Sequence, residues 1–201
     1  MTTTSHVTVR AVDHDFVRRR IEEFEDLLVR RMSEPPWHLA WERGVTDDPM
    51  SARGFLETFL VGNEYGVDGD YFVAMDGDKI VGFAIGVKLT GSLIAHLSLD
   101  KLDLDPCPQD GDYYHCIGIL DTPYRQRGIY GQLVARRCEC ANGSARHWVR
   151  THVEQETVWG LFETRLGFLR VKTYTSTPDD YGGHPLTRHV LRHDGPVNVP
   201  E

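Results

Sequence analysis

The hydrophobic pattern of the first sixty residues changes its period once and predicts a strand followed by helices. Residues 6–12, "HVTVRAV", alternate apolar and polar side chains, as a half-buried strand does. Residues 13–32 follow the helical period, which predicts one amphipathic helix. Its apolar positions include Phe16, Ile21, Phe24, Leu27 and Leu28. A second, short helix is predicted within residues 51–62.

The segment between these helices, residues 33–50, combines prolines, glycine and acidic residues with the bulky rings of Trp37, His38 and Trp41. Proline and glycine interrupt regular elements, so this segment is predicted to be a loop. We interpret the three rings as packing within the loop rather than as the wall of a substrate site.

Residues 71–89 carry the clearest local signal, because two β-rich apolar runs flank Asp76, Gly77 and Asp78. An Asp-Gly pair supplies the positive φ angles of a tight turn, so the segment predicts a β-hairpin. The next residues, about 88–112, carry five aspartates together with Pro106 and Pro108. Proline interrupts a continuous element, and we interpret this insertion as a solvated, loop-rich segment.

The second half of the chain alternates between the two periods. Strands are predicted at residues 113–120, 147–153, 169–177 and 186–193, and helices at residues 128–143 and 157–168. Asn142–Gly143 is predicted to end the first of these helices in a left-handed conformation. The second helix is predicted to begin at Thr157 as its N-cap and to end at Gly167.

Composition narrows the class of protein. A chain of 201 residues with 40% apolar content can bury a sizeable core, and we expect a single domain over residues 1–201. The net charge of −8 repels polyanions, which disfavours nucleic acid and anionic membranes as partners. The longest apolar run, residues 80–87, is too short to span a bilayer, and no signal peptide is evident, so we expect a cytoplasmic location.

Cysteine and histidine spacing indicates no metal site. The four cysteines include no CxxC pair, so neither a disulfide framework nor a zinc site is predicted. Cys138 and Cys140 lie two apart on a predicted helix and cannot face one another. His189 and His193 share a face of a predicted strand but are well separated. We therefore expect reduced thiols and no bound metal.

The stretch from Arg125 to Gly131 joins a predicted strand to a predicted helix. The first N–H groups of a helix have no internal partner and lie at the positive end of its dipole, so they bind anions. Glycines leave room for a bulky diphosphate, and arginines add charge. We predict an anion site suited to a diphosphate, made by Arg125, Gln126, Arg127, Gly128, Ile129, Tyr130 and Gly131. A nicotinamide dinucleotide loop and a nucleoside triphosphate loop are disfavoured, because GxGxxG and GxxxxGK[ST] are both missing.

The same stretch, "ILDTPYRQRGIYGQLV", resembles the coenzyme-binding motif of the GNAT acyltransferase superfamily, in which Arg or Gln precedes Gly-x-Gly/Ala by three residues. Arg125 and Gly128 match this motif. The second small position falls on Tyr130, with Gly131 one residue later. The hairpin before the motif and "FETRLGF" after it extend the resemblance over roughly residues 6 to 175.

This resemblance implies an α/β (α+β) fold with a mixed central sheet, mostly antiparallel with one splayed parallel pair of strands, flanked by helices. It implies that acetyl-CoA, the co-substrate, lies between the strands at 113–120 and 147–153. Backbone N–H groups near Ile119 and Leu120 would hold the thioester, and Phe162 is expected beside the coenzyme. The implied activity is transfer of an acetyl or short acyl group to a primary amine of a small molecule.

Attack by an amine on a thioester requires the neutral amine. Deprotonating an alkylammonium at pH 7 costs about 4–5 kcal/mol, so a general base matters more than an acid. The candidate bases are His115, whose ordinary pKa suits the task, then Asp112 and Asp121, with Tyr114 as a positioning group.

The general acid departs from the family pattern. Relatives commonly protonate the departing thiolate with a tyrosine four residues before the glycine of the closing Gly-Phe, where this chain has Glu163. The neighbouring Phe162 has a ring but no hydroxyl. Glu163, Tyr174 on the following predicted strand, or water is then the candidate acid.

Two other functions stay open at this stage. One is an acyl-CoA-binding module without catalytic activity, and the other is a transferase of the same fold that uses a non-CoA acyl donor, such as a carrier-protein thioester. One hypothesis is that acidic residues line an entrance for a cationic amine, namely Asp47 and Asp48 together with the insertion's Asp100, Asp103, Asp105, Asp110 and Asp112. Exposed strand edges make dimers common in such folds, so a homodimer is a further option.

Overall fold

The fold is built on one seven-stranded mixed sheet with the strand order β1-β2-β3-β4-β5-β7-β6. The structure is a computed structural model that describes residues 6–39, 41, 43–45, 51–60, 65–176 and 185–199. The strands are β1 (Val7–Val12), β2 (Gly69–Asp76), β3 (Lys79–Lys88), β4 (Tyr113–Leu120), β5 (Arg146–His152), β6 (Leu169–Thr175) and β7 (Thr187–Asp194). All neighbours pair antiparallel except β4 and β5, which are parallel. The predicted mixed sheet is therefore confirmed.

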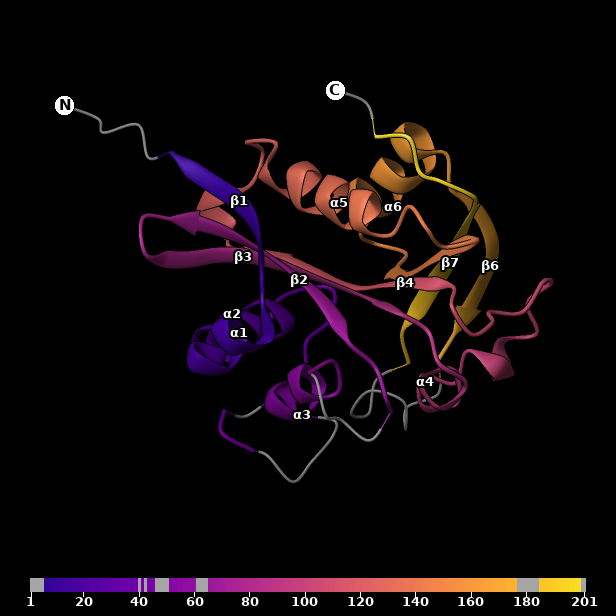
Figure 1. The fold of residues 1–201 in the computed structure, drawn as a ribbon, viewed down its shortest axis with the longest axis horizontal. Helices are drawn as coiled ribbons and strands as arrows, with labels where there is room; N and C mark the ends of the chain where they lie inside the picture. The colour runs from indigo at the N-terminus through magenta and orange to yellow at the C-terminus, as the bar shows by residue number, and fades with distance from the viewer. Residues whose placement is uncertain are drawn as a thin grey trace.

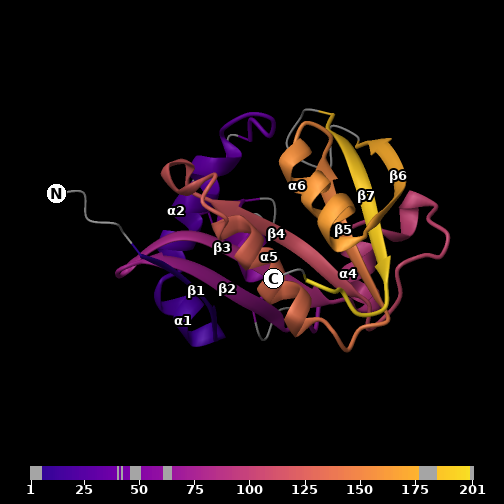
Figure 2. The ribbon, with the colours of Figure 1, turned by 90° about the horizontal axis from the view of Figure 1, so that it is seen from above.

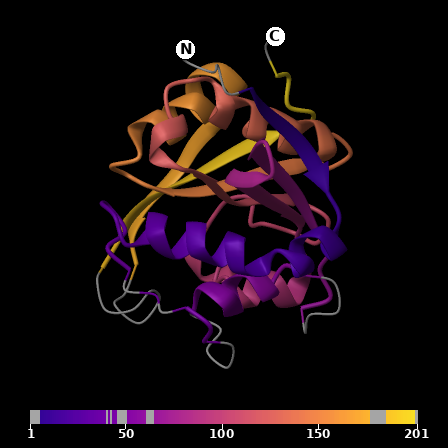
Figure 3. The same cartoon turned by 90° about the vertical axis from the view of Figure 1, so that its left-hand side faces the viewer.

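Helices cover both faces of this sheet (Figures 1 and 3). One face, called here the α2 face, carries α1 (His14–Arg19), α2 (Ile21–Met32), α3 (Ala52–Glu57) and α4 (Gly91–His96). The other, called the α5 face, carries α5 (Ile129–Cys140) and α6 (Glu156–Gly160), which continues as a π-helix over Leu161–Arg165. Short 3-10 helices occupy Asp100–Leu102 and Thr122–Tyr124. None of the helices in the described ranges is long and apolar enough to span a membrane.

Most of the apolar core lies between the sheet and the α2 face. There Phe24 and Leu28 of α2 pack with Phe83 and Ile85 of β3, and all four are fully buried. Two smaller clusters lie on the α5 face, one under α5 and one under α6 and its π-helical extension. The sheet is therefore buried on both sides, which holds the strands rigidly around the gap described below.

Two predicted elements differ from the structure. The helix predicted over residues 13–32 is two helices, because the backbone at Arg20 leaves helical values (φ −120°, ψ 19°). The insertion at about 88–112 is not entirely a solvated loop, because it contains α4. Thr90 accepts the Leu93 N–H as the N-cap of α4, and Leu93 is fully buried, which fixes this turn of helix against the core.

The turn and cap predictions are confirmed in part. The hairpin forms, with Asp76 paired to Lys79, but Gly77 alone takes a positive φ (+58°). Gly143 does not take a positive φ, so the left-handed stop predicted after α5 is wrong. The N-cap of α6 is Gln155, so the prediction that this helix begins with Thr157 as its N-cap is wrong. Gly167 has φ +74° and ends the following helix as predicted.

A bulge in β4 opens the sheet at its centre. Val87 of β3 pairs with Tyr114 and Ile85 with Ile117, so β4 has one residue more than β3 between these pairs. The parallel pairing of β4 with β5 covers only Tyr113–His115 and ends at the same point. Beyond it the two strands diverge, and α6 lies over the open end (Figure 2).

Candidate functional site

A pocket occupies the gap between the diverging strands β4 and β5 and is lined by residues from both faces of the sheet. The strands contribute residues 114–118 of β4 and 149–151 of β5. The α2 face contributes mainly apolar and aromatic side chains: Met32, Trp37, Leu39, Trp41, Phe55, Phe59 and Leu97. The α5 face contributes Tyr130, Arg137, Gln155, Val158 and Phe162. The fold thus joins a site under α5 and α6 to an apolar chamber beside α2 and α3.

Trp37 and Trp41 line this pocket, so their interpretation as rings that only pack within a loop is wrong. Trp37 lies edge-on to His152, with ring centroids 5.6 Å apart, and the Arg188 guanidinium lies 5.5 Å from the Trp37 centroid. These contacts hold the loop after α2 against β5 and β7. The position of the Trp37 ring therefore depends on residues far away in the sequence, and the composition of the loop does not reveal that position.

The predicted coenzyme loop lies exposed at the start of α5. Arg125 to Gly128 are all exposed, and Gln126 and Gly128 take left-handed φ values of +60° and +74°. No heavy atom lies within 4 Å of an added Cβ at Gly128 or Gly131. Within the described part of the chain, the N–H groups of Ile129, Tyr130 and Gly131 have no acceptor. The loop therefore offers unsatisfied donors, two cationic side chains and open space, which fits a diphosphate.

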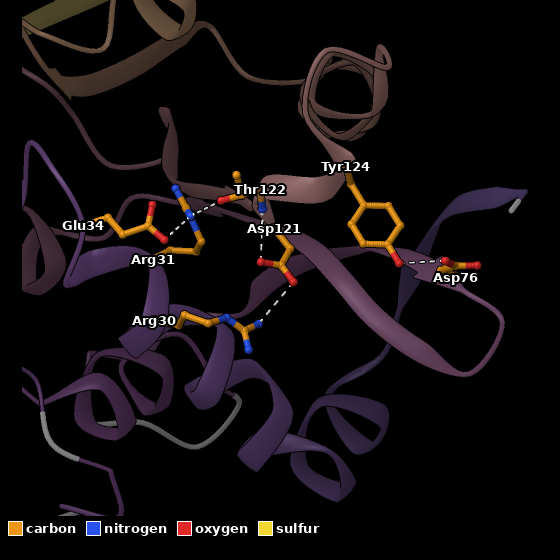
Figure 4. Close-up of polar contacts among 7 residues, drawn as sticks. All are labelled: Arg30, Arg31, Glu34, Asp76, Asp121, Thr122 and Tyr124. Carbon is orange, nitrogen blue, oxygen red and sulfur yellow. Dashed lines mark hydrogen bonds and ion pairs between the residues drawn. The ribbon is translucent and has the colours of Figure 1, made fainter.

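The segment that leads into this loop is tied to the rest of the fold (Figure 4). The Tyr124 hydroxyl donates to Asp76 Oδ2 at 2.7 Å, and Arg31 donates to the Thr122 hydroxyl. Asp121 accepts the Thr122 N–H at 3.1 Å and lies 3.4 Å from the Arg30 guanidinium. Asp121, a candidate base, thus caps the 3-10 helix and lies outside the described pocket lining.

Tyr130, which occupies the second small position of the motif, points away from the loop and toward β4. An added Cβ at Gly118 would lie 2.9 Å from the Tyr130 hydroxyl, so the ring fills the space left by this glycine. Burial raises the pKa of the Tyr130 phenol. The ring therefore forms part of the pocket wall and leaves the helix start open.

Arg137 is a pocket residue that the sequence prediction missed. Its side chain is 1% exposed, and Nη1 donates to the carbonyls of Ile117 (2.7 Å) and Ile85 (3.2 Å), the two residues beside the bulge. Its Nε has no acceptor, and no carboxylate forms an ion pair with it, among the described residues. The signal was available: position 137 follows Leu133 and Val134 on the apolar face of the helix, where a charge requires an explanation.

His115, the first candidate base, lines the pocket on the α5 face. It is 2% exposed, and neither ring nitrogen has a partner among the described residues. The ring is stacked on His147 at 5.7 Å and touches Phe162 edge-on at 5.5 Å. Burial, then the charges of Arg137 and His147, lowers the pKa of His115 well below its ordinary value. The imidazole is therefore neutral at pH 7.

The other predicted catalytic residues lie outside the described lining of the pocket. Asp112 is 2% exposed and accepts the Trp148 Nε1–H at 2.9 Å and Arg146 Nε–H at 3.2 Å, which is an anchoring role. Glu163 accepts two hydrogen bonds from Arg170, at 2.8 and 2.9 Å.

Tyr174 is separated from Glu163 by the sheet. It packs on the α2 face, where its hydroxyl accepts Arg150 Nη1–H at 3.3 Å. Phe162, which was predicted beside the coenzyme, is 1% exposed and lines the pocket. Ile119 and Leu120 are paired with β3 and buried, and Gly118 is the last β4 residue that lines the pocket. The part of β4 that faces the gap therefore lies slightly before the residues that were predicted.

The charged side chains that line the pocket are basic, and the hypothesis of an acidic entrance stays untested. The pocket's charged lining residues are three arginines, Arg137, Arg150 and Arg188, and no acidic residue is among those described as lining it. Asp103 is fully exposed and lies 3.9 Å from Lys172, and Asp105 is also exposed. Asp47 and Asp48 lie outside the described residues.

Comparison with known proteins identifies the fold. No protein-family model matches the sequence, and no curated protein sequence matches it. The acetyltransferase of GNAT family from Streptococcus pneumoniae is similar in structure, with a TM-score of 0.56 at 12% identity over 94% of this chain and 99% of that chain. A protein of Salmonella typhimurium classed as an acetyltransferase, solved with its cofactor acetyl-CoA, has a TM-score of 0.56 at 12% identity over 94% and 93%.

A third similar structure is the ribosomal-protein-S18-alanine N-acetyltransferase from Escherichia coli. Its TM-score is 0.55 at 14% identity, over 98% of this chain and 97% of that chain. At these identities the similarity shows the fold, which is the GNAT acetyltransferase fold.

Proposed function

We propose that this chain is an N-acyltransferase that moves an acetyl or short acyl group from acyl-CoA to a primary amine of a small molecule. One observation carries the proposal: a single pocket fills the gap between β4 and β5, with Tyr130 and Arg137 of α5 on one side of the sheet and the apolar chamber beside α2 on the other. The similarity in fold to acetyltransferases supports the same reaction class.

The residues of the loop fit a coenzyme A diphosphate. Arg125 and Arg127 supply charge, and the N–H groups of Ile129, Tyr130 and Gly131 supply donors that the protein leaves unused within its described part. Past His115, the side of β4 that faces β5 has no strand partner among the described residues, so an extended pantetheine arm can pair there. The thioester supplies an acyl carbon that is activated toward a nucleophile.

In the proposed reaction the amine nitrogen attacks the thioester carbonyl. The new C–N bond forms, the C–S bond breaks, the thiol receives one proton, and the amide is released. The arginines of the pocket lower the pKa of an ammonium group placed near them, which increases the fraction of neutral amine. Of the predicted general acids and bases, His115 is the one that belongs to the described lining of the pocket. Its neutral imidazole can accept the proton directly or through a water.

Binding of the donor tests the first half of the proposal. Isothermal titration should detect acetyl-CoA binding to the purified protein. The double substitution Arg125→Glu with Arg127→Glu is expected to weaken this binding at least about tenfold, roughly 1.4 kcal/mol. Arg136→Glu, at an exposed position of the same helix, is the control and should bind like the wild type. Equal binding by the double variant would overturn the assignment of the loop.

Thiol release from acetyl-CoA with a panel of amines tests the second half. His115→Phe, which preserves the aromatic packing with Phe162, is expected to lower kcat about 10²-fold or more if His115 moves the proton. Binding without thiol release would favour an inactive acyl-CoA-binding module, and absence of binding by a cooperatively folded protein would favour another acyl donor. Either result would overturn the proposed reaction.

A further inference from the structure

Positive charge gathers in the pocket of a protein that is acidic as a whole. The chain has a net charge of −8, yet Arg137, Arg150 and Arg188 line the pocket with no acidic residue among the described lining. This arrangement is the reverse of a site that selects a simple cationic amine, because like charges oppose its approach. An anionic group on the ligand would be matched by the pocket.

Two of these arginines face the apolar chamber on the α2 face. Arg188 is 5% exposed, and its guanidinium lies 5.5 Å from the centroid of the Trp37 ring. Arg150 is held by the Leu97 carbonyl at 3.0 Å and the Tyr174 hydroxyl at 3.3 Å. Stacking and hydrogen bonds orient the guanidinium planes, and an oriented planar fork is suited to a carboxylate.

The third arginine adds an independent indication. Arg137 is buried on the opposite side of the gap, and its Nε has no acceptor among the described residues. A buried cation without a carboxylate partner is costly, so its surroundings favour a ligand that brings negative charge or a hydrogen-bond acceptor. Arginine side chains therefore line the pocket on both sides of the gap between β4 and β5.

The other side chains of the chamber indicate the chemical nature of the rest of the ligand. Trp41, Phe55, Phe59 and Met32 present apolar surface, and Phe55 packs edge-on against Phe59 at 5.2 Å. Burial of an apolar or aromatic group against this surface is favourable at about 25 cal/mol per Å². A ligand that fits both features has an apolar body and an anionic group.

From these features we infer that the acceptor is an amine that also carries a carboxylate on an apolar or aromatic body, with Arg150 and Arg188 binding the carboxylate. This inference rests on the proposed acyl transfer and adds the class of acceptor. Because the two arginines lie on the α2 face, the carboxylate belongs to the acceptor rather than to the acyl group. The carboxylate then holds the molecule while the amine faces the gap.

The test compares amines that differ only by the carboxylate. Suitable pairs are L-phenylalanine with 2-phenylethylamine, L-leucine with 3-methylbutylamine, and 4-(aminomethyl)benzoate with benzylamine. With saturating acetyl-CoA, thiol release should give a kcat/KM at least tenfold higher for the carboxylate-bearing member of at least one pair. Preference for the member without the carboxylate in every reactive pair, or a preference for succinyl-CoA over acetyl-CoA with those amines, would overturn the inference.

Substitutions assign the preference to the arginines. Arg188→Gln and Arg150→Gln should each lower the ratio of kcat/KM between the carboxylate-bearing amine and its carboxylate-free counterpart ten- to hundredfold, mainly through the KM of the carboxylate-bearing amine. Arg192→Gln, on the same strand as Arg188 but outside the described lining, is the control. A variant that is poorly folded would lose both activities together, so the ratio within each pair is the decisive quantity. An unchanged ratio would overturn the assignment.

An error in the inferred class of acceptor can be distinguished from failure of the proposed acyl transfer. If acetyl-CoA binds but no amine releases thiol, titration of the acetyl-CoA complex with each pair measures recognition without turnover. Tighter binding of the carboxylate-bearing members, lost in Arg188→Gln, would support the acceptor class even though catalysis fails. Equal binding of both members of all pairs would overturn it.

Discussion

We expect protonation of His147 to lower the free energy of unfolding, and to do so at a pH above that at which carboxylates are protonated. The His147 side chain is fully buried, and its ring nitrogens have no partner among the described residues. Burial, then the neighbouring His193, lowers the pKa of His147 to about 4. The unfolded chain, with an ordinary histidine pKa of about 6.5, therefore binds the proton more readily than the folded one.

The sign and size of the effect follow from this difference. Because the pKa is depressed in the folded state, the stabilisation is present above about pH 6.5 and is lost as the pH falls toward 4. Between pH 7 and pH 5, His147 alone should reduce the free energy of unfolding by about 2 kcal/mol. For a chain of this size that corresponds to a fall in Tm of about 4–8 °C. The lowered pKa of His115 acts in the same direction.

Urea denaturation at pH 7 and pH 5 measures this loss, with His147→Phe as the test variant. Phenylalanine keeps an aromatic ring beside Phe168 and cannot be protonated. The variant should lose about 2 kcal/mol less than the wild type between the two pH values. His6→Gln, at an exposed position, is the control and should lose as much as the wild type. Equal losses in His147→Phe and the wild type would refute the assignment of acid sensitivity to this ring.

Three further substitutions test the geometry around the site. Gly86→Ala would place a Cβ 2.1 Å from the Tyr113 hydroxyl beside the bulge, and denaturation should show a loss of about 1–3 kcal/mol; unchanged stability would contradict this packing. Ser51→Ala removes the acceptor of the Gly54 N–H at 2.9 Å and should cost about 1 kcal/mol by the same measurement, whereas no loss would show that the cap is dispensable. Gly128→Ala forces a residue with a Cβ to take φ +74°, at about 1–2 kcal/mol, and titration should show weaker acetyl-CoA binding; full affinity would argue against the loop geometry.

Local signals predicted the elements that depend on neighbouring residues. The hairpin of β2 and β3 follows from two apolar runs around Gly77, and the start of α5 follows from Gly128 at the end of a strand and turn. The exposed loop at Arg125 to Gly128 was also predictable, because glycine and arginine at a helix start have a direct chemical meaning. In each case the interacting groups lie within a few residues of one another in the chain.

The bulge in β4, the burial of Arg137 and the role of Trp37 were not predicted. Each depends on contacts between segments far apart in sequence: the extra β4 residue appears only against β3, and Arg137 donates hydrogen bonds to carbonyls of two different strands. The three arginines of the pocket lining were not predicted either, because the sequence does not show which charged side chains turn inward.

The amino-acid sequence by itself determined the order of most strands and helices and the exposed loop at the start of α5, because hydrophobic period, glycine and helix-start donors act over short stretches of chain. The tertiary structure alone decided where β4 and β5 separate, which side chains enclose the gap and what charge they present. Those properties come from strand register and from packing across both faces of the sheet, and no single segment of the chain encodes them.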